Sequence, residues 1–588
     1  MPPLYIPLNN PDKEIRLLTS NYILTTHPLA TAPPFAALSY VWGSPADTTP
    51  ITINNNTISI TKTLATALHN LRGTITIPLW ADAICINQSS ISERTHQVQI
   101  MHEIYSLASA VVVYLGSGTV HTDFAMQNMA DARFRAGLRR SFFESTPSTE
   151  EVMVDVVLKH DLCKRPWWKR LWVRQEFILS SKDPVIACGD KFVRWSELME
   201  CFLSLPRSWD HPGLEGLWAD CRREVTGSED DVPGTNGIHL VSLDMIRENV
   251  RSSGGLNLFE AVRYVLRNSK ATNSLDYVYG LLGILCEGER SRLLVHYEVE
   301  RMELYRQVMG TLWTDHGDSV LRELLSVLEF SPENSDGRFP SWVPDFAAQP
   351  TRWWKDYWCL MGYSVLEGPK GAPRVRLEGQ LLVLHGVILD RVAAAFATPE
   401  SFDDIRELIP ILRKVESAMC KGIQLPIPPD HPLRALSPLK MEEAVVQTLT
   451  RSVVEYDEPL LTGVDDEQVM TALLGRSELD SLEFEVPGSD IGPENRAFDR
   501  LARLLRAKFV GRQALVTESG FAGIGVRQIV EGDVVTFPFG GNAPLVLRPC
   551  GAEWAVVGGA YISGLMDPAL VEGLVIAGQL QPVEFGIR

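Results

Sequence analysis

The chain has 588 residues, and at roughly 100–200 residues per domain this length predicts three or four domains. It carries 55 basic and 73 acidic residues, which gives a net charge of −18, and the basic residues form no strong cluster. An acidic chain without a basic patch lacks the electrostatic footprint of a nucleic-acid-binding protein, so we expect no nucleic-acid partner. With 45% hydrophobic and 22% charged residues, the composition is that of a globular protein with apolar cores.

The nine cysteines are scattered along the chain and are never spaced as C-x-x-C. Such single cysteines are typical of small core residues, so we expect no disulfide framework and no metal site. The N-terminus lacks the basic start and apolar run of a signal peptide, and no segment approaches the ~18 apolar residues of a membrane span. We therefore expect a cytoplasmic protein without a transmembrane segment.

The first ~190 residues alternate between strand and helix patterns. In chain order, the patterns predict a strand, a β-hairpin, a helix, a strand, a helix, a strand and a helix, over residues 36–42, 51–60, 64–71, 78–86, 90–108, 110–115 and 166–179. Ser90 and Glu93 are spaced as a capping box at the start of the second of these helices. Apolar strands that alternate with helices predict an α/β domain over residues 1–190, with a parallel sheet covered on both faces.

The remainder of the chain changes in character after residue 190. Residues 191–370 predict a mainly helical middle region, and residues 371–495 a mixed and helical region that ends in an acidic linker. Residues 496–588 contain short strands cut by glycines, which predict a small antiparallel β domain, a barrel or a sandwich. Two polar, turn-rich stretches, 226–234 and 487–493, are expected to be solvated loops.

Ligands of open α/β sheets bind beyond the carboxyl ends of the strands. Near that edge, Trp172 and Glu176 stand four residues apart and therefore share one face of a predicted helix. A carboxylate beside an indole suits a ribosyl ring that carries a planar leaving group, because the carboxylate stabilises an oxocarbenium-like transition state while the indole stacks on the base. The alternative is structural: Trp172 packs in the core, and Glu176 pairs with Arg174 or Arg170 at the surface.

Asp82 is unusual because it lies in an otherwise apolar predicted strand, where a carboxylate requires a partner. That partner is either Arg94 or a capping backbone amide, and both assignments are structural. Asn87 and Gln88 follow the same strand and either offer amide groups to a ligand or close a turn. The sequence contains no G-x-S-x-G nucleophile motif, no P-loop and no H-E-x-x-H metal motif.

Three blocks of sequence together indicate a family. They are Ala37-Leu38-Ser39-Tyr40-Val41-Trp42-Gly43; Leu79 to Gln88 with Glu93-Arg94, Gln97-Val98, Met101 and Ile104-Tyr105; and Arg165, Trp167, Arg170, Trp172 and Gln175-Glu176. These blocks resemble the heterokaryon-incompatibility (HET) domain of filamentous fungi. Segments outside the first ~190 residues, including Ala271-Thr272-Asn273 before Asp276 and Ser341-Trp342-Val343-Pro344-Asp345, also resemble such proteins.

The resemblance implies a role in fungal non-self recognition, in which incompatible fusion triggers regulated cell death. It also implies an N-terminal fold that is flavodoxin-like and distantly related to TIR domains, some of which cleave NAD with a glutamate four positions after a tryptophan. Trp172 and Glu176 match that spacing, which implies NAD as a substrate, no resident cofactor, and Glu176 as the catalytic residue. The nucleotide-binding residues implied by the matching blocks are Ser39, Tyr40, Trp42, Gly43, Asp82, Asn87, Gln88, Arg94 and Trp172.

This chain departs from the family pattern in a segment of about fifty residues before the Trp172 helix, and in Ala81, where many members have a bulkier residue. Three functions remain open: an NAD glycohydrolase, a non-catalytic signalling adaptor that self-associates through the HET domain, and a HET fold recruited to another metabolic reaction. The sequence shows neither a sensor ATPase nor a repeat array, so recognition is expected from the middle region, the C-terminal region or a protein partner.

Overall fold

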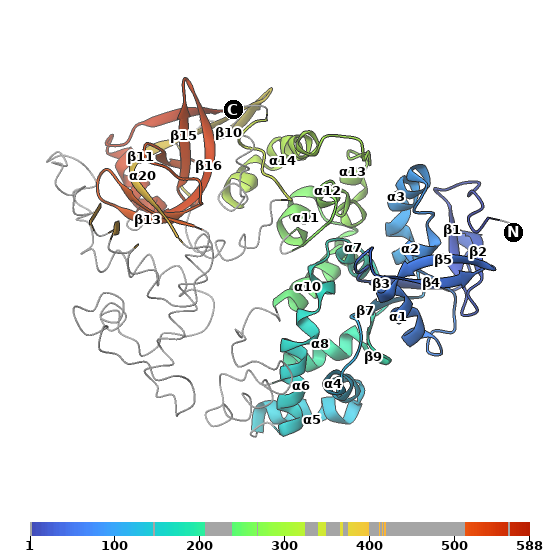
Figure 1. Ribbon diagram of the computed structural model, residues 1–588. Helices are drawn as coiled ribbons and strands as arrows, with labels where there is room; N and C mark the ends of the chain where they lie inside the picture. The colour runs from blue at the N-terminus through green and yellow to red at the C-terminus, as the bar shows by residue number, and fades with distance from the viewer. Residues whose placement is uncertain are drawn as a thin grey trace. The chain divides into compact units, whose positions relative to one another are not determined.

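The fold is given by a computed structural model that describes residues 3–144, 148–205, 238–266, 269–323, 339–347, 365–368, 374–398, 512–562 and 565–588, with residues 411, 414, 415, 417 and 418. The chain divides into two compact units, Met1–Val299 and Glu300–Arg588. Their elements are labelled in Figure 1. The predicted loops 226–234 and 487–493, and the part of the predicted mixed region from 419 to 495, lie outside the described residues.

The first unit is built on a mixed sheet in the order β2-β1-β6-β3-β7-β8-β9. Its strands are β1 (Glu14–Leu18), β2 (Leu24–Pro28), β3 (Ala36–Tyr40), β6 (Leu79–Trp80), β7 (Ala110–Tyr114), β8 (Val185–Cys188) and β9 (Lys191–Arg194). The central strands β6, β3, β7 and β8 pair in parallel, as predicted, while β1, β2 and β9 add antiparallel pairings at the edges. The parallel strands follow the flavodoxin-like order, which places the topological switch point between β3 and β7.

Two local predictions in this unit are confirmed. The hairpin consists of β4 (Thr48–Ile53) and β5 (Asn56–Thr61), and it turns at Asn54 and Asn55, whose φ angles of 49° and 63° are the positive values that asparagine tolerates in tight hairpins. The helix that follows, α1 (Lys62–Leu71), buries its apolar face, which consists of Leu64, Ala67, Leu68 and Leu71.

The predicted strand over residues 78–86 is wrong in its second half. Strand β6 ends at Trp80, and the chain turns at once into the short helix α2 (Asp82–Cys85), in which Ala81 O accepts from the Cys85 amide over 2.7 Å. The Asp82 carboxylate accepts from the Ala83 amide over 2.7 Å and so satisfies a backbone group of this turn. An apolar run of this length does not by itself distinguish a strand from a buried helical turn.

The third sequence block also divides differently from the prediction of one helix beginning at Pro166. A 3₁₀ turn covers Pro166–Lys169, Arg170 is extended, and helix α7 runs over Trp172–Ile178. Arg170 forms an isolated parallel bridge with Lys270. A segment about a hundred residues further along the chain therefore interrupts the helix at the point where its sequence pattern is continuous.

The first unit contains further helices, and those that follow β9 confirm the predicted helical middle region. The long segment before α7 forms α4 (Val120–Ala130), α5 (Ala132–Glu144) and α6 (Thr149–His160), and α4 packs against β9 and α6. Beyond β9 lie α8 (Trp195–Ser204), α10 (Ile238–Ser253), α11 (Leu258–Val265), α12 (Asp276–Tyr279) and α13 (Glu287–Arg290). Helices α10 and α3 (Ile91–Leu107) both pack against α7.

The second unit contains helix α14 (Arg301–Glu323) and an antiparallel barrel (Figure 1). The strands are β10 (Val375–Glu378), β11 (Leu381–Ala397), β12 (Gln513–Thr517), β13 (Ala522–Gly525), β14 (Val534–Pro538), β15 (Leu545–Cys550), β16 (Glu553–Ile562) and β17 (Pro582–Ile587), with helix α20 (Pro568–Ile576) before the last. Strand β11 closes the barrel by pairing with both β12 and β14, and its register shifts twice along its length. Because β10 and β11 belong to it, the barrel draws on residues before the predicted 496–588 domain.

Ser341 and Trp342 attach a further segment to the barrel. The Ser341 hydroxyl donates to the Arg588 carbonyl and accepts from the Val556 amide over 3.0 Å, and the Trp342 indole donates to the Gln380 carbonyl over 3.0 Å. Within the described part of the chain, no helix has the length and apolarity needed to cross a membrane. The same residues hold no group of three or more His, Cys, Asp or Glu that could bind a metal ion.

Candidate functional site

Glu176 lies on α7, which packs against the central strands β3 and β7 at the switch point of the sheet. Its side chain is 3% exposed, and its Oε2 atom has no hydrogen-bond partner among the described residues. Burial raises the pKa of Glu176 to about 7; the Asp82 charge adds to this, while Arg170 and the hydroxyls of Ser39 and Tyr105 oppose it. An interior carboxyl group that exchanges its proton near neutral pH is a candidate for a functional role.

The two hydroxyls beside Glu176 are held in place by other groups. Ser39 Oγ accepts from the Trp167 indole over 2.8 Å, and the Tyr105 hydroxyl donates to the Leu38 carbonyl over 3.0 Å. This bond holds the Tyr105 hydroxyl in a fixed position on the buried side of the site. The β3 backbone and the turn before α7 thereby fix the surroundings of the carboxylate.

Arg170 and Asp82 are the two charged groups that act on the pKa of Glu176. Asp82 accepts from the Trp42 indole over 2.8 Å in addition to the Ala83 amide. Burial raises the pKa of Asp82, and the positive charge of Arg170 opposes this rise. Arg170 also donates to the carbonyl of Tyr40, whose hydroxyl has its pKa held well above the usual value by burial and by the charge of Asp82.

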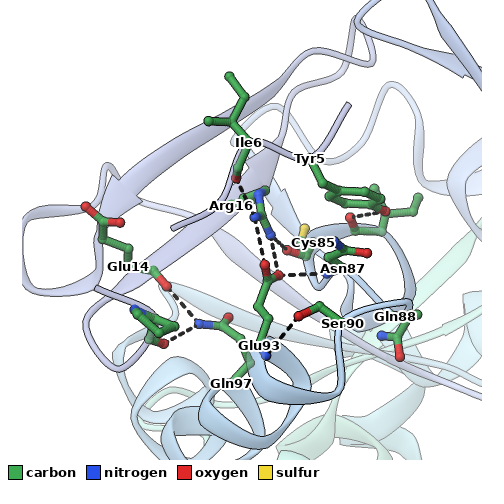
Figure 2. A network of polar contacts seen from close by, with 12 residues as sticks. Tyr5, Ile6, Glu14, Arg16, Cys85, Asn87, Gln88, Ser90, Glu93 and Gln97 are labelled. Atoms are coloured by element: carbon green, nitrogen blue, oxygen red, sulfur yellow. Dashed lines mark hydrogen bonds and ion pairs between the residues drawn. The ribbon is translucent and has the colours of Figure 1, made fainter. Parts of the chain in front are cut away.

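The loop after α2 is fixed by a buried ion pair that Figure 2 shows from close by. Arg16 and Glu93, 2% and 9% exposed, are joined by two hydrogen bonds of 2.6 Å and 3.0 Å, and Arg16 also donates to the carbonyls of Ile6 and Cys85. Glu93 Oε1 accepts from the Asn87 amide over 2.8 Å. Ser90 caps α3 as predicted, because its hydroxyl accepts from the Glu93 amide over 3.2 Å. The Glu93 carboxylate does not complete the predicted capping box but pairs with Arg16.

Asn87 and Gln88 are therefore largely engaged in closing this loop. The Asn87 side chain accepts from the Ser89 amide over 3.2 Å, and the Gln88 side chain donates to the Asp82 carbonyl over 3.0 Å.

Gly43 has a φ of 76°, and a Cβ there would lie 2.4 Å from Thr63 Oγ1, so the turn after β3 requires glycine.

Trp172 and Arg94 meet at a different carboxylate, Asp276. The Trp172 indole donates to Asp276 Oδ2 over 2.9 Å, and the Tyr297 hydroxyl donates to Oδ1 over 3.0 Å. The Arg94 guanidinium lies over the Tyr297 ring, 5.9 Å from its centroid. Burial raises the pKa of Asp276, and the hydrogen bonds and the charges of Arg94 and Arg170 oppose this rise.

Several structural alternatives from the sequence can now be decided. Glu176 is buried, and among the described residues it forms no ion pair with Arg170 or Arg174, so the surface pair is wrong. Arg174 is itself buried, which lowers its pKa to about 10, and it donates to the Trp168 carbonyl over 3.1 Å. The partner of Asp82 is a backbone amide, that of Ala83, as one of the two predicted alternatives stated. The other predicted partner, Arg94, lies over the Tyr297 ring.

The structure thus places most of the predicted site residues in two groups, while Gly43, Asn87 and Gln88 form the turn after β3 and the loop after α2. Ser39, Tyr40 and Asp82 surround Glu176, with Trp42 attached through Asp82, whereas Trp172 and Arg94 lie at Asp276. Sequence reasoning assigned no site role to Arg170, Tyr105, Asp276 or Tyr297. Arg170 and Tyr105 lie inside the sequence blocks that resemble the HET domain, and this position is a signal that they belong to the site. Nothing in the sequence connects Asp276 with Trp172.

Comparisons with known proteins agree with this organisation. Residues 35–176 match the family model "Heterokaryon incompatibility protein (HET)", and residues 468–574 match the "Het-6 beta-barrel domain". The chain is 22% identical to "Heterokaryon incompatibility protein 6, OR allele" of Neurospora crassa over 96% of both proteins. No solved structure matches. Residues 35–176 therefore match a HET domain, and the chain is similar over almost its whole length to a fungal heterokaryon incompatibility protein.

Proposed function

We propose that this protein acts in fungal heterokaryon incompatibility and that its HET domain cleaves NAD, with Glu176 as the catalytic residue. The relationship to a heterokaryon incompatibility protein along almost the whole chain supports the first part. One observation carries the second: a buried carboxyl group with a pKa of about 7 lies at the switch point of a parallel sheet, beside Asp82 and Arg170. The flavodoxin-like strand order and the Trp172–Glu176 spacing support a distant relationship to TIR domains.

The chemistry requires a negative charge and no general acid at the leaving group. The bond between ribose C1′ and the nicotinamide nitrogen breaks with its electron pair going to the pyridinium ring, so nicotinamide leaves as a neutral molecule. Ionised Glu176 would stabilise the ribosyl cation that remains. Water then attacks C1′ and releases one proton, which gives ADP-ribose. A bound cation also lowers the pKa of Glu176, because an opposite charge favours the ionised form.

The neighbouring residues have separate tasks in this proposal. Arg170 favours the ionised form of Glu176, as its effect on the pKa indicates. The partly exposed Trp42 and Trp172 offer aromatic surfaces for stacking on planar rings. Asp82 accepts from Trp42 and acts on Glu176 through its charge, and in this proposal its carboxylate also accepts from ribose hydroxyls. Ser39 and Tyr105 position the catalytic carboxylate.

Cytoplasmic NAD depletion would link this reaction to regulated cell death. We further propose that self-association through the HET domain controls the activity, with fusion to an incompatible partner as the trigger. In a second candidate function the domain is a self-associating adaptor without catalysis. The buried Glu176 favours the enzyme, because its Oε2 atom has no hydrogen-bond partner among the described residues. A buried acceptor without a partner lowers stability, and a purely structural role would not explain why it is there.

The test is nicotinamide release from NAD by the full-length protein over a series of protein concentrations. Three proteins are compared: the wild type, Glu176→Gln, and Glu103→Gln as a control at an exposed glutamate. We expect release by the wild type and by Glu103→Gln, rising with self-association, and none by Glu176→Gln. Absence of release from all three proteins, with folding and self-association confirmed, would contradict the enzyme and favour the adaptor.

A further inference from the structure

The segment from Lys270 to Gly283 lies directly on α7, although it follows the HET match by about a hundred residues. The Leu171 amide donates to the Lys270 carbonyl over 2.9 Å, and the Gln175 side chain donates to the Tyr279 carbonyl over 3.2 Å. At Gly283 a Cβ would lie 2.4 Å from Gln175 Oε1. This close approach requires glycine and fixes the segment against the helix that carries Glu176.

Asp276 is the charged member of this segment that contacts α7. Each of its carboxylate oxygens accepts from a different aromatic side chain, Oδ2 from the Trp172 indole and Oδ1 from the Tyr297 hydroxyl. Two bonds to two oxygens hold both the carboxylate and the indole in one orientation. Hydrogen bonds to an ionised acceptor are among the stronger ones in proteins.

We propose that Asp276 is a positioning residue that orients the Trp172 indole for stacking on the nucleotide base. The inference rests on the proposed function, since it concerns how the same site binds NAD. The indole is only partly buried, so core packing does not lock it from every side. A stacking ring that is already oriented loses less rotational freedom when the base binds, and the affinity is higher for that reason.

The assignment extends the nucleotide-binding unit beyond the match to the HET family model, which ends at residue 176. Burial raises the pKa of Asp276, and the charges of Arg94, which lies over the Tyr297 ring, and of Arg170 oppose this rise. The group around Glu176 and the group around Asp276 are linked through Arg170, whose charge acts on both carboxyl groups. The substrate class that these two groups fit is a planar base attached to ribose.

The test is a double-mutant cycle on NAD binding by the full-length protein. All variants carry Glu176→Gln so that NAD is not consumed, and isothermal titration calorimetry gives the dissociation constant. We expect Asp276→Asn and Trp172→Phe each to weaken NAD binding about ten-fold. The double variant should bind no more weakly than Trp172→Phe, because Asp276 acts through the indole.

A matched control exists outside these two groups, because the Trp195 indole donates to Asp244 over 2.6 Å. Trp195 also packs edge-to-face against Phe177 of α7, with ring centroids 4.6 Å apart. The Asp244→Asn variant therefore shows whether general loosening near α7 is sufficient to weaken binding. We expect NAD binding by Asp244→Asn to stay within about two-fold of the parent. If Asp276→Asn loses its cooperative unfolding transition, Asp276→Glu, which moves the carboxylate by one methylene, takes its place in the cycle.

The outcomes separate this inference from the function on which it rests. Unchanged affinity in Asp276→Asn, additive losses in the double variant, or an equal loss in Asp244→Asn would each overturn the positioning role while NAD binding persists. A parent protein that binds no NAD, together with a wild type that releases no nicotinamide, would overturn the proposed function and this inference with it.

Discussion

The Trp167 indole donates to the Ser39 hydroxyl over 2.8 Å, across 128 residues of sequence. This bond joins the turn before α7 to the central strand β3 and fixes one of the two hydroxyls beside Glu176. The second hydroxyl, that of Tyr105, comes from α3. All three sequence blocks that resemble the HET domain therefore meet around one carboxylate, which accounts for their occurrence together.

The raised pKa of Glu176 predicts a specific dependence of stability on pH. The folded-state pKa of about 7 exceeds the unfolded value of 4.5, so the folded protein binds more protons between these values. The free energy of unfolding that Glu176 contributes is fully present below about pH 4.5 and declines as the pH rises, by roughly 3 kcal/mol up to about pH 7. Urea unfolding of the wild type and Glu176→Gln should show a difference that changes by this order over that window. A difference independent of pH would contradict the buried, titrating carboxyl group.

Arg170 is predicted to set the pH at which NAD cleavage begins. Since its charge lowers the pKa of Glu176, Arg170→Gln should shift the acidic limb of the kcat/KM profile to higher pH. Arg170→Lys retains the charge and should shift the limb less, although it loses the planar guanidinium that donates to the Tyr40 carbonyl. The measurement is the initial rate of nicotinamide release between about pH 5 and 9. A limb at the same pH in Arg170→Gln would show that Arg170 does not act on the catalytic carboxylate.

The Arg16–Glu93 pair is predicted to stabilise the first unit through the loop that follows α2. Removing one partner leaves a buried charge without compensation, so Arg16→Met should lower the free energy of unfolding by about 3–5 kcal/mol. Arg16→Met combined with Glu93→Met should lose less than the sum of the two single variants. Chemical denaturation measures all four proteins, and additive losses would show that the two side chains do not act as a pair.

Acid should weaken the same pair in a predictable direction. Burial opposes ionisation of Glu93, but the bonds from Arg16 and the Asn87 amide prevail, and the pKa of Glu93 lies below its usual value. The stabilisation is therefore present above about pH 4.5 and is lost as the pH falls further. The stability difference between the wild type and Glu93→Gln should narrow in that range, and a constant difference would contradict the ion pair.

Much of the N-terminal fold could be predicted from the sequence because its signals are local. Alternating β-branched residues and two asparagines predict the β4–β5 hairpin, and helical spacing predicts α1. The α2 turn was missed because Ala81 to Ile86 has the composition of a buried strand, and the backbone bonds to Ala81 that favour the turn have no sequence signature. The paired strands β11 and β14 lie more than a hundred residues apart, so barrel closure by β11 could not be read from a local pattern.

The candidate site was predictable where residue types and spacing carry the information. Trp172 and Glu176 were chosen from their spacing, yet they belong to separate groups in the structure, because the indole donates to Asp276 while Glu176 is buried under β3. The roles of Asp276 and Tyr297 depend on contacts across 104 and 21 residues. A single sequence does not encode such pairings in a readable form, since they arise from tertiary packing.

The most direct test of the central claim compares the rate of NAD cleavage by the self-associated wild type and by Glu176→Gln at about pH 8, with nicotinamide and ADP-ribose identified as products. If ionised Glu176 stabilises the ribosyl cation, the substitution should lower kcat by at least about 100-fold, because a preorganised electrostatic group contributes on that scale. Equal rates in the two proteins would contradict the assignment of Glu176, and no cleavage by either protein would contradict the enzymatic function itself.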